Sequence, residues 1–182
     1  TVSAKAVVTV QSVSDVVLIQ NISITPAITP VTASGGTGTL SYSIDPALPT
    51  GLNFNTANGQ ITGVPSSPSS IATYTVTVTD SNSVPQSSSK TFTLVVNQLP
   101  ALSTTLSQAT ASLTQNTAIT AFIPVTATGG HGTLTYGISP ALPAGLSFNS
   151  TNGQITGTPT VISGTTNYSI TVTDLALQSS SK

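Results

Sequence analysis

Residues 35–63 read GGTGTLSYSIDPALPTGLNFNTANGQITG, and residues 129–157 repeat them as GGHGTLTYGISPALPAGLSFNSTNGQITG. The match continues without a gap to Asp80 and Asp174, and 28 of the 46 aligned pairs are identical. A repeat of this length, with its own turns and apolar runs, indicates one folding unit present twice. The sequence therefore predicts two domains of one type.

Each copy carries the pattern of half-buried β-strands. In the first copy Tyr74, Val76 and Val78 alternate with threonines, and Tyr168, Ile170 and Val172 do the same in the second. Such alternation puts apolar side chains on one face of a strand. The Asn-Gly pairs at 58–59 and 152–153 are typical of hairpin turns. About seven short strands per copy predict an all-β fold of two tandem sandwiches.

Composition excludes several classes of function. Of 182 residues 61 are Ser or Thr, only 7 are charged, and the net charge is −1, so we expect no nucleic-acid partner. No apolar run approaches the roughly 20 residues of a membrane helix, and we expect no membrane insertion. Without Cys and with a single histidine, His131, we predict no cofactor, no metal site and no catalytic residues.

Residues 136–149 (YGISPALPAGLSFN), followed by NGQITGTP at 152–159 and the strand 168–174, resemble the immunoglobulin-like repeats of large bacterial and archaeal surface proteins, a group that includes cadherin-like repeats. This resemblance covers about three quarters of the chain. It implies a secreted, extracellular or cell-surface protein whose domains serve as spacers, stalks or adhesive modules. It fixes no ligand.

Two aspartates occupy matching positions at strand ends. Asp80 and Asp174 could bind calcium between domains, as in some cadherin-like repeats, but neither has an acidic neighbour in sequence. Calcium takes 6–8 oxygen ligands, usually with several carboxylates. We therefore interpret both aspartates as turn caps.

The two ends of the chain suggest self-assembly. We divide it into a donor-like strand at 1–12, a first domain at 13–97 and a second domain at 98–182 whose final strand is absent. Ala6, Val8 and Val10 share the spacing of Phe92, Leu94 and Val96 in the last strand of the first copy. The amino-terminal strand could thus complete the second domain of another copy.

That reasoning predicts a non-catalytic homopolymer. Its copies would assemble head to tail into a filament, each donating its amino-terminal strand with the side chains of Ala6, Val8 and Val10. The alternative is a stalk or spacer cut from a long repetitive adhesin, with surface glycans as its ligands. Both explanations leave the same residues at the same ends. Because the chain has no Trp, and its four Tyr hold matching strand positions, the usual stacking platform for sugars is not expected.

Overall fold

The computed structural model describes residues 5–182, and these form fifteen strands and no helix. The chain divides into two compact units, residues 1–99 and 100–182. Because no helix is found among the described residues, none there is long and apolar enough to cross a membrane. The predicted all-β fold with two tandem immunoglobulin-like sandwiches is confirmed.

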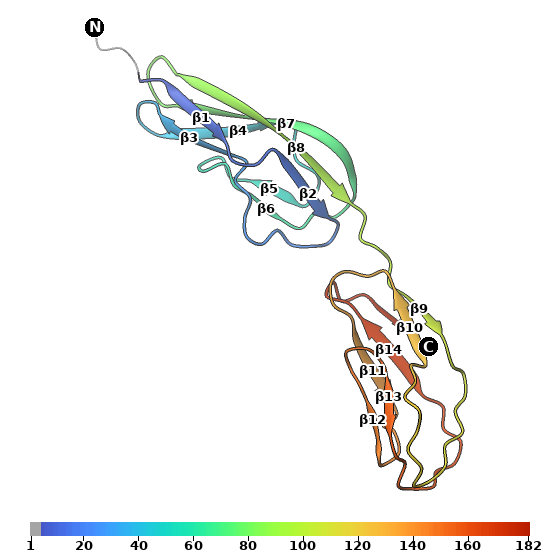
Figure 1. Ribbon diagram of the computed structural model, residues 1–182. Coiled ribbons are helices and arrows are strands. Elements are labelled where there is room, and N and C mark those ends of the chain that lie inside the picture. The colour runs from blue at the N-terminus through green and yellow to red at the C-terminus, as the bar shows by residue number, and fades with distance from the viewer. Residues whose placement is uncertain (1–4) are drawn as a thin grey trace. The chain divides into compact units, whose positions relative to one another are not determined.

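Eight strands build the first domain (Figure 1). They are β1 (Val7–Gln11), β2 (Asp15–Ile19), β3 (Val31–Gly35), β4 (Leu40–Asp45), β5 (Leu52–Phe54), β6 (Ile61–Gly63), β7 (Ser69–Asp80) and β8 (Ser87–Asn97). One sheet has the order β2-β8-β7-β4, and the pairs β1–β3 and β5–β6 complete the sandwich. All pairings are antiparallel except β2–β8, which is parallel.

The core of the first domain follows the predicted alternation. Tyr74, Val76 and Val78 of β7 are buried, while the threonines between them are only half-buried. The rings of Tyr74 and Phe92 stack with their centroids 5.5 Å apart. Ten buried apolar side chains from six of the strands close this core. Burial of such side chains is the main driving force for folding.

The Asn-Gly pair lies in a hairpin, as predicted, but the turn is longer than two residues. Strands β5 and β6 are joined by residues 55–60, and the amide of Gly59 donates to the carbonyl of Asn55 over 2.8 Å. Only Gly59 of the pair has a positive φ, at 72°. The turn is therefore closed around one left-handed glycine rather than two left-handed residues.

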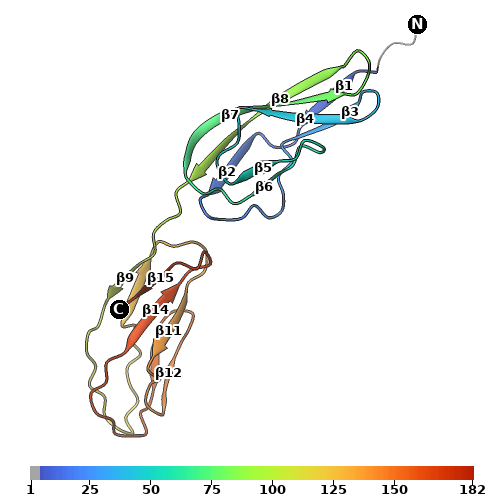
Figure 2. The ribbon, with the colours of Figure 1, turned by 180° about the vertical axis from the view of Figure 1, so that it is seen from behind.

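Seven strands form the second domain (Figure 2). They are β9 (Ser103–Leu106), β10 (Val125–Thr128), β11 (Thr135–Ser139), β12 (Leu146–Phe148), β13 (Ile155–Gly157), β14 (Ser169–Thr173) and β15 (Ser179–Ser181). The sheets are β11-β14-β15, β10-β9 and β12-β13. Its main core cluster holds three fully buried side chains, Val125, Ile170 and Val172.

One predicted boundary differs from the structure. Residues 1–4 of the expected donor strand at 1–12 lie outside the described residues, and the rest is part of the first domain, because β1 pairs with β3 from Val7 to Gln11. The final strand of the second domain is represented by its beginning alone. The short strand β15 pairs with β14 over three residues as the beginning of β8 pairs with β7, and no described strand corresponds to residues 91–97.

Candidate functional site

Of the proposed donor residues, Val8 and Val10 lie on the outer face of β1, and Ala6 lies just before this strand. Ala6 is exposed, and Val8 and Val10 are 53% and 57% exposed, whereas Val7 and Thr9 are 6% exposed. The pairing of β1 with β3 sets this parity, since neighbouring strand residues point to opposite faces. The predicted inward orientation therefore does not hold within this chain. Insertion of these residues into another copy stays a prediction.

A buried pair of hydroxyl groups ties the first strand to the last in each domain. Thr9 Oγ1 lies 2.8 Å from Ser88 Oγ, and Thr104 Oγ1 lies 2.8 Å from Ser180 Oγ. Thr9 and Thr104 are each 6% exposed. Sequence reasoning missed this pair because a buried Thr in a Thr-rich chain looks the same as an exposed one. The repeated contact shows that β1 and β9 play the same part in their domains.

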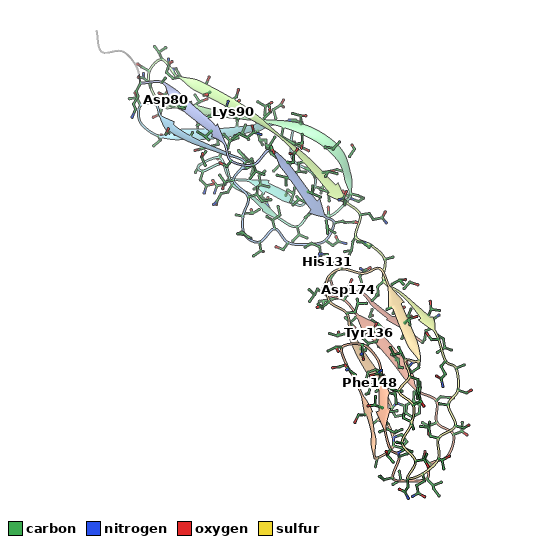
Figure 3. All side chains as sticks on the ribbon, in the orientation of Figure 1. Asp80, Lys90, His131, Tyr136, Phe148 and Asp174 are labelled. Atoms are coloured by element: carbon green, nitrogen blue, oxygen red, sulfur yellow. The ribbon has the colours of Figure 1, made fainter. Side chains whose placement is uncertain are left out.

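The carboxylate of Asp80 closes the turns at one end of the first domain (Figure 3). Its Oδ1 accepts hydrogen bonds from the amides of Gln86 at 2.8 Å and Asn82 at 3.4 Å, and its Oδ2 accepts one from Thr37 at 2.9 Å. The amide of Gln86 foremost, with those of Thr37 and Asn82, lowers the pKa of Asp80 against the opposing effect of burial. Asp80 is a turn cap, as predicted.

Asp174 does the same in the second domain, where Figure 3 labels it with His131. Burial raises its pKa, but hydrogen bonds from the amide of His131 and from the side chain and amide of Gln178 outweigh that effect and lower it overall. The Nδ1 atom of His131 is buried without a hydrogen-bond partner. The imidazole thus lacks, at this atom, the acid that orients a catalytic histidine.

Within residues 5–182 no group of three or more His, Cys, Asp or Glu side chains is placed to hold a metal ion. In both matching aspartates, each carboxylate oxygen instead accepts a hydrogen bond from an N–H group. Each Asp therefore serves the fold of its own domain.

Three of the four tyrosines pack within their domains. Tyr74 is 5% exposed, and Tyr42, Tyr136 and Tyr168 are half-buried. Tyr42 and Tyr136 each lie against a hairpin glycine, where a Cβ on Gly59 or Gly153 would come within 2.7 or 2.8 Å of the ring. Three of the four rings are therefore engaged in packing, whereas Tyr168 lines the open cavity of the second domain.

The second domain contains an open cavity of about 680 Å³. Its walls come from residues 108–113 and 161–168, and its floor from apolar side chains that include Val125, Ile155 and Ile170. Lys182 is the one charged residue among those lining it. We call this cavity the strand slot.

Comparison with known proteins finds one family model and one kind of curated relative. The family described as "Putative Ig domain" matches residues 6–97 and again residues 100–182. The "Serine-rich adhesin for platelets" of Staphylococcus aureus is 34% identical over 146 residues, which cover 79% of this chain and 6% of that protein. In strain MRSA252 the identity is 33% and the match covers 10% of the protein. The chain thus spans a small part of these relatives.

Among solved structures, mouse cadherin-23 repeats EC22-24 are 19% identical with a TM-score of 0.41, and cover 93% of this chain and 59% of theirs. Human protocadherin-24 repeats EC1-2 are 12% identical with a TM-score of 0.45, and cover 95% and 87%. The family match rests on both halves of the chain, in agreement with the repeat and with the two sandwiches. The chain belongs to the "Putative Ig domain" family and carries two copies of that domain in tandem.

Proposed function

We propose that this chain is a non-catalytic spacer segment of a large cell-surface adhesin, exposed outside the cell. The observation that carries the proposal is its similarity to the staphylococcal adhesin over 146 residues, a length that must include parts of both domains. In both domains the turn aspartates accept hydrogen bonds that hold the fold, and Tyr42, Tyr74 and Tyr136 pack within it. The role requires no cofactor, nucleic acid or membrane insertion.

The surface suits a spacer. Charged side chains make up 4% of the chain, so its contacts with solvent depend little on ionic strength. The outward positions of β7 carry Thr75, Thr77 and Thr79, which are half-buried, and those of β8 carry Ser or Thr from residue 87 to residue 93, followed by Val95 and Asn97. Hydroxyl-bearing, β-branched residues are favoured on such strand faces.

The test separates spacing from binding. Beads would carry the 182-residue chain alone, or the chain joined to a biotin-binding tip, and their capture on glycan-coated and biotin-coated surfaces would be counted. We expect capture only on biotin and only with the tip. Capture of tipless beads by a glycan surface would overturn the spacer proposal in favour of an adhesive module.

A filament subunit remains the second proposal, and two observations favour it. Val8 and Val10 form an exposed apolar row at the amino-terminal strand, and the second domain has an apolar slot. Donor-strand exchange would also require β1 to leave β3 and to break the contact between Thr9 and Ser88. Because of this loss, we favour the spacer.

Electron microscopy of the chain and of its V8D/V10D variant tests the filament directly. Both valines are exposed, so the variant should keep the fold of the first domain, whereas charges at these positions could not enter an apolar slot. Fibres from the parent chain and none from the variant would establish the filament. Single particles from both chains would contradict the filament and leave the spacer proposal standing.

A further inference from the structure

Each domain carries one Asn-Gly pair, at 58–59 and at 152–153, and this pair is chemically labile. The backbone nitrogen of the glycine can attack Cγ of the asparagine side chain, since no Cβ shields that nitrogen. Ammonia leaves, a five-membered succinimide forms, and water then opens the ring to aspartate or isoaspartate. Water is the one co-reactant, so the rate depends on how freely the two groups meet.

In both hairpins the attacking nitrogen is engaged in a hydrogen bond. The amide of Gly59 donates to Asn55 O over 2.8 Å, and that of Gly153 donates to Asn149 O over the same distance. Both glycines are buried. The nitrogen becomes a nucleophile only after it loses its proton, and a buried N–H group that donates to a carbonyl is shielded from the base that would remove this proton. The same shielding slows amide hydrogen exchange until the structure opens.

The asparagine side chain is also held in place. Asn58 Oδ1 accepts a hydrogen bond from the amide of Gln60 at 3.1 Å, and Asn152 Oδ1 accepts one from the amide of Gln154 at 3.0 Å. In the first domain Asn58 Nδ2 donates to Gln60 Oε1 over 3.1 Å as well. These bonds fix the rotation of the side chain, so it loses the freedom with which Cγ would approach the glycine nitrogen. The hairpin therefore restrains both partners of the reaction.

A tyrosine ring makes the glycine of each pair necessary. A Cβ at Gly59 would lie 2.7 Å from Cδ1 of Tyr42. In the second domain a Cβ at Gly153 would lie 2.8 Å from Cδ1 of Tyr136, which Figure 3 labels. Both glycines also have φ +72°, a conformation that disfavours other residues. Replacement of the glycine would therefore strain the turn, and the hairpin keeps a reactive pair that it must shield.

We propose that Asn58 and Asn152 are deamidation sites that the folded hairpins keep unreactive, and that each becomes reactive when its own domain opens. Conversion to isoaspartate would insert a methylene group into the backbone of the turn, so the hydrogen bond from the glycine could not re-form in register. Either product adds one negative charge to a chain whose net charge is −1. Each domain would thus carry a covalent record of having opened. This inference concerns the hairpins alone and does not depend on the role of the chain as a spacer.

Incubation of the full chain in mildly alkaline buffer for several weeks tests the shielding. One sample stays folded, as circular dichroism verifies, and the other is unfolded in guanidinium chloride. Peptide mass spectrometry then measures the fraction of aspartate plus isoaspartate at positions 58 and 152. Because the reaction requires opening, we expect conversion at both sites to be at least about tenfold slower in the folded chain. Equal rates in the two samples would overturn the proposal.

Two matched variants test whether each site follows its own domain. Tyr42→Ala removes the ring that lies against Gly59, and Tyr136→Ala removes the ring that lies against Gly153. Each change should loosen one hairpin and speed conversion at the asparagine of that domain several-fold, while the other domain serves as the internal control. A domain that the change unfolds should react at the rate of the unfolded chain, which would support the same link. Acceleration at both sites alike, or at neither, would refute the proposal.

A peptide of residues 149–157 gives the rate without the fold and without denaturant. It contains the whole second turn but lacks Tyr136, and an isolated hairpin is at best marginally stable in water. Asn152 in the peptide should therefore react as fast as it does in the unfolded chain. A peptide as slow as the folded chain would show that the local sequence, and not the fold, protects the pair, and would overturn the proposal.

Discussion

At the scale of single residues, the two domains depend on matching carboxylates. Asp80 and Asp174 are each 4% exposed and gather amides from turns on either side of a strand end. A buried donor left without an acceptor destabilises a fold. The pKa of Asp15 is also lowered, by hydrogen bonds from the side chains of Thr93 and Ser14. With so few charges in the chain, these aspartates connect its stability to pH.

Acid should therefore unfold the chain in a defined window. The pKa values of Asp80 and Asp174 are lowered from the ordinary 3.8, so the unfolded chain takes up protons first as the pH falls. Their stabilising effect is complete above that value and is lost as the pH falls through the lowered pKa values. Chemical denaturation should show constant stability from pH 7 to about 5 and a decline below about 4.

Replacing either carboxylate by an amide should remove part of this decline. In D80N or D174N an amide nitrogen would meet an N–H donor, so the melting temperature of the affected domain should fall by several degrees at pH 7. The exposed Asp45 provides the control, and D45N should melt as the parent does. A D80N variant as stable as the parent at pH 7 would contradict the capping role.

The glycine-rich turns make a second prediction at this scale. Gly35 has φ +81°, and a Cβ there would lie 2.2 Å from Ala6 O; at Gly129 the values are +75° and 2.0 Å from Ala101 O. Both contacts are to backbone, which cannot move aside. G35A and G129A should each cost about 2 kcal/mol or more in the unfolding free energy of their domain. Gly164, with nothing near its Cβ position, is the control.

At the scale of elements, strand β8 accounts for the difference in stability between the two domains. Leu94 has no exposed surface, so L94A should lower the stability of the first domain by about 2–5 kcal/mol, as expected for a core truncation. V17A, at a site 65% exposed on β2, should change it by less than about 0.5 kcal/mol. Urea unfolding measures both. A small effect of L94A would mean that β8 does not close the core.

Sequence pattern could predict some elements and not others. Strand β7 was predictable because Tyr74, Val76 and Val78 are apolar on one parity only. The amino-terminal strand has apolar residues on both parities, at Ala6, Val7, Val8 and Val10, so alternation cannot choose its inner face. The choice comes from the pairing with β3 and from the hydroxyl contact of Thr9, which are long-range.

The parallel pairing of β2 with β8 also could not be predicted from the sequence. Its partners are 78 residues apart in the chain, at Asp15 and Thr93, and no local turn joins them. For the same reason the strand slot could not be located from residues alone. Only the fold shows that residues 108–113 and 161–168 flank this cavity.

At the scale of the whole molecule, the two domains share a fold but not a complete core. The first buries ten apolar side chains in one cluster and the second three in its main cluster. Since burial of apolar surface supplies most of the stability of a domain, the second should unfold first. Calorimetry should show two transitions, the lower one assigned to residues 100–182 by hydrogen exchange. One shared transition would contradict this order.

The measurement that most directly tests the account of two independent spacer modules is single-molecule stretching of the chain between its ends. We predict two separate unfolding events, each releasing about 3.3–3.6 Å per residue of its domain, with the second domain yielding at the lower force because β15 pairs over only three residues. A single event that released the whole chain at once would contradict the account.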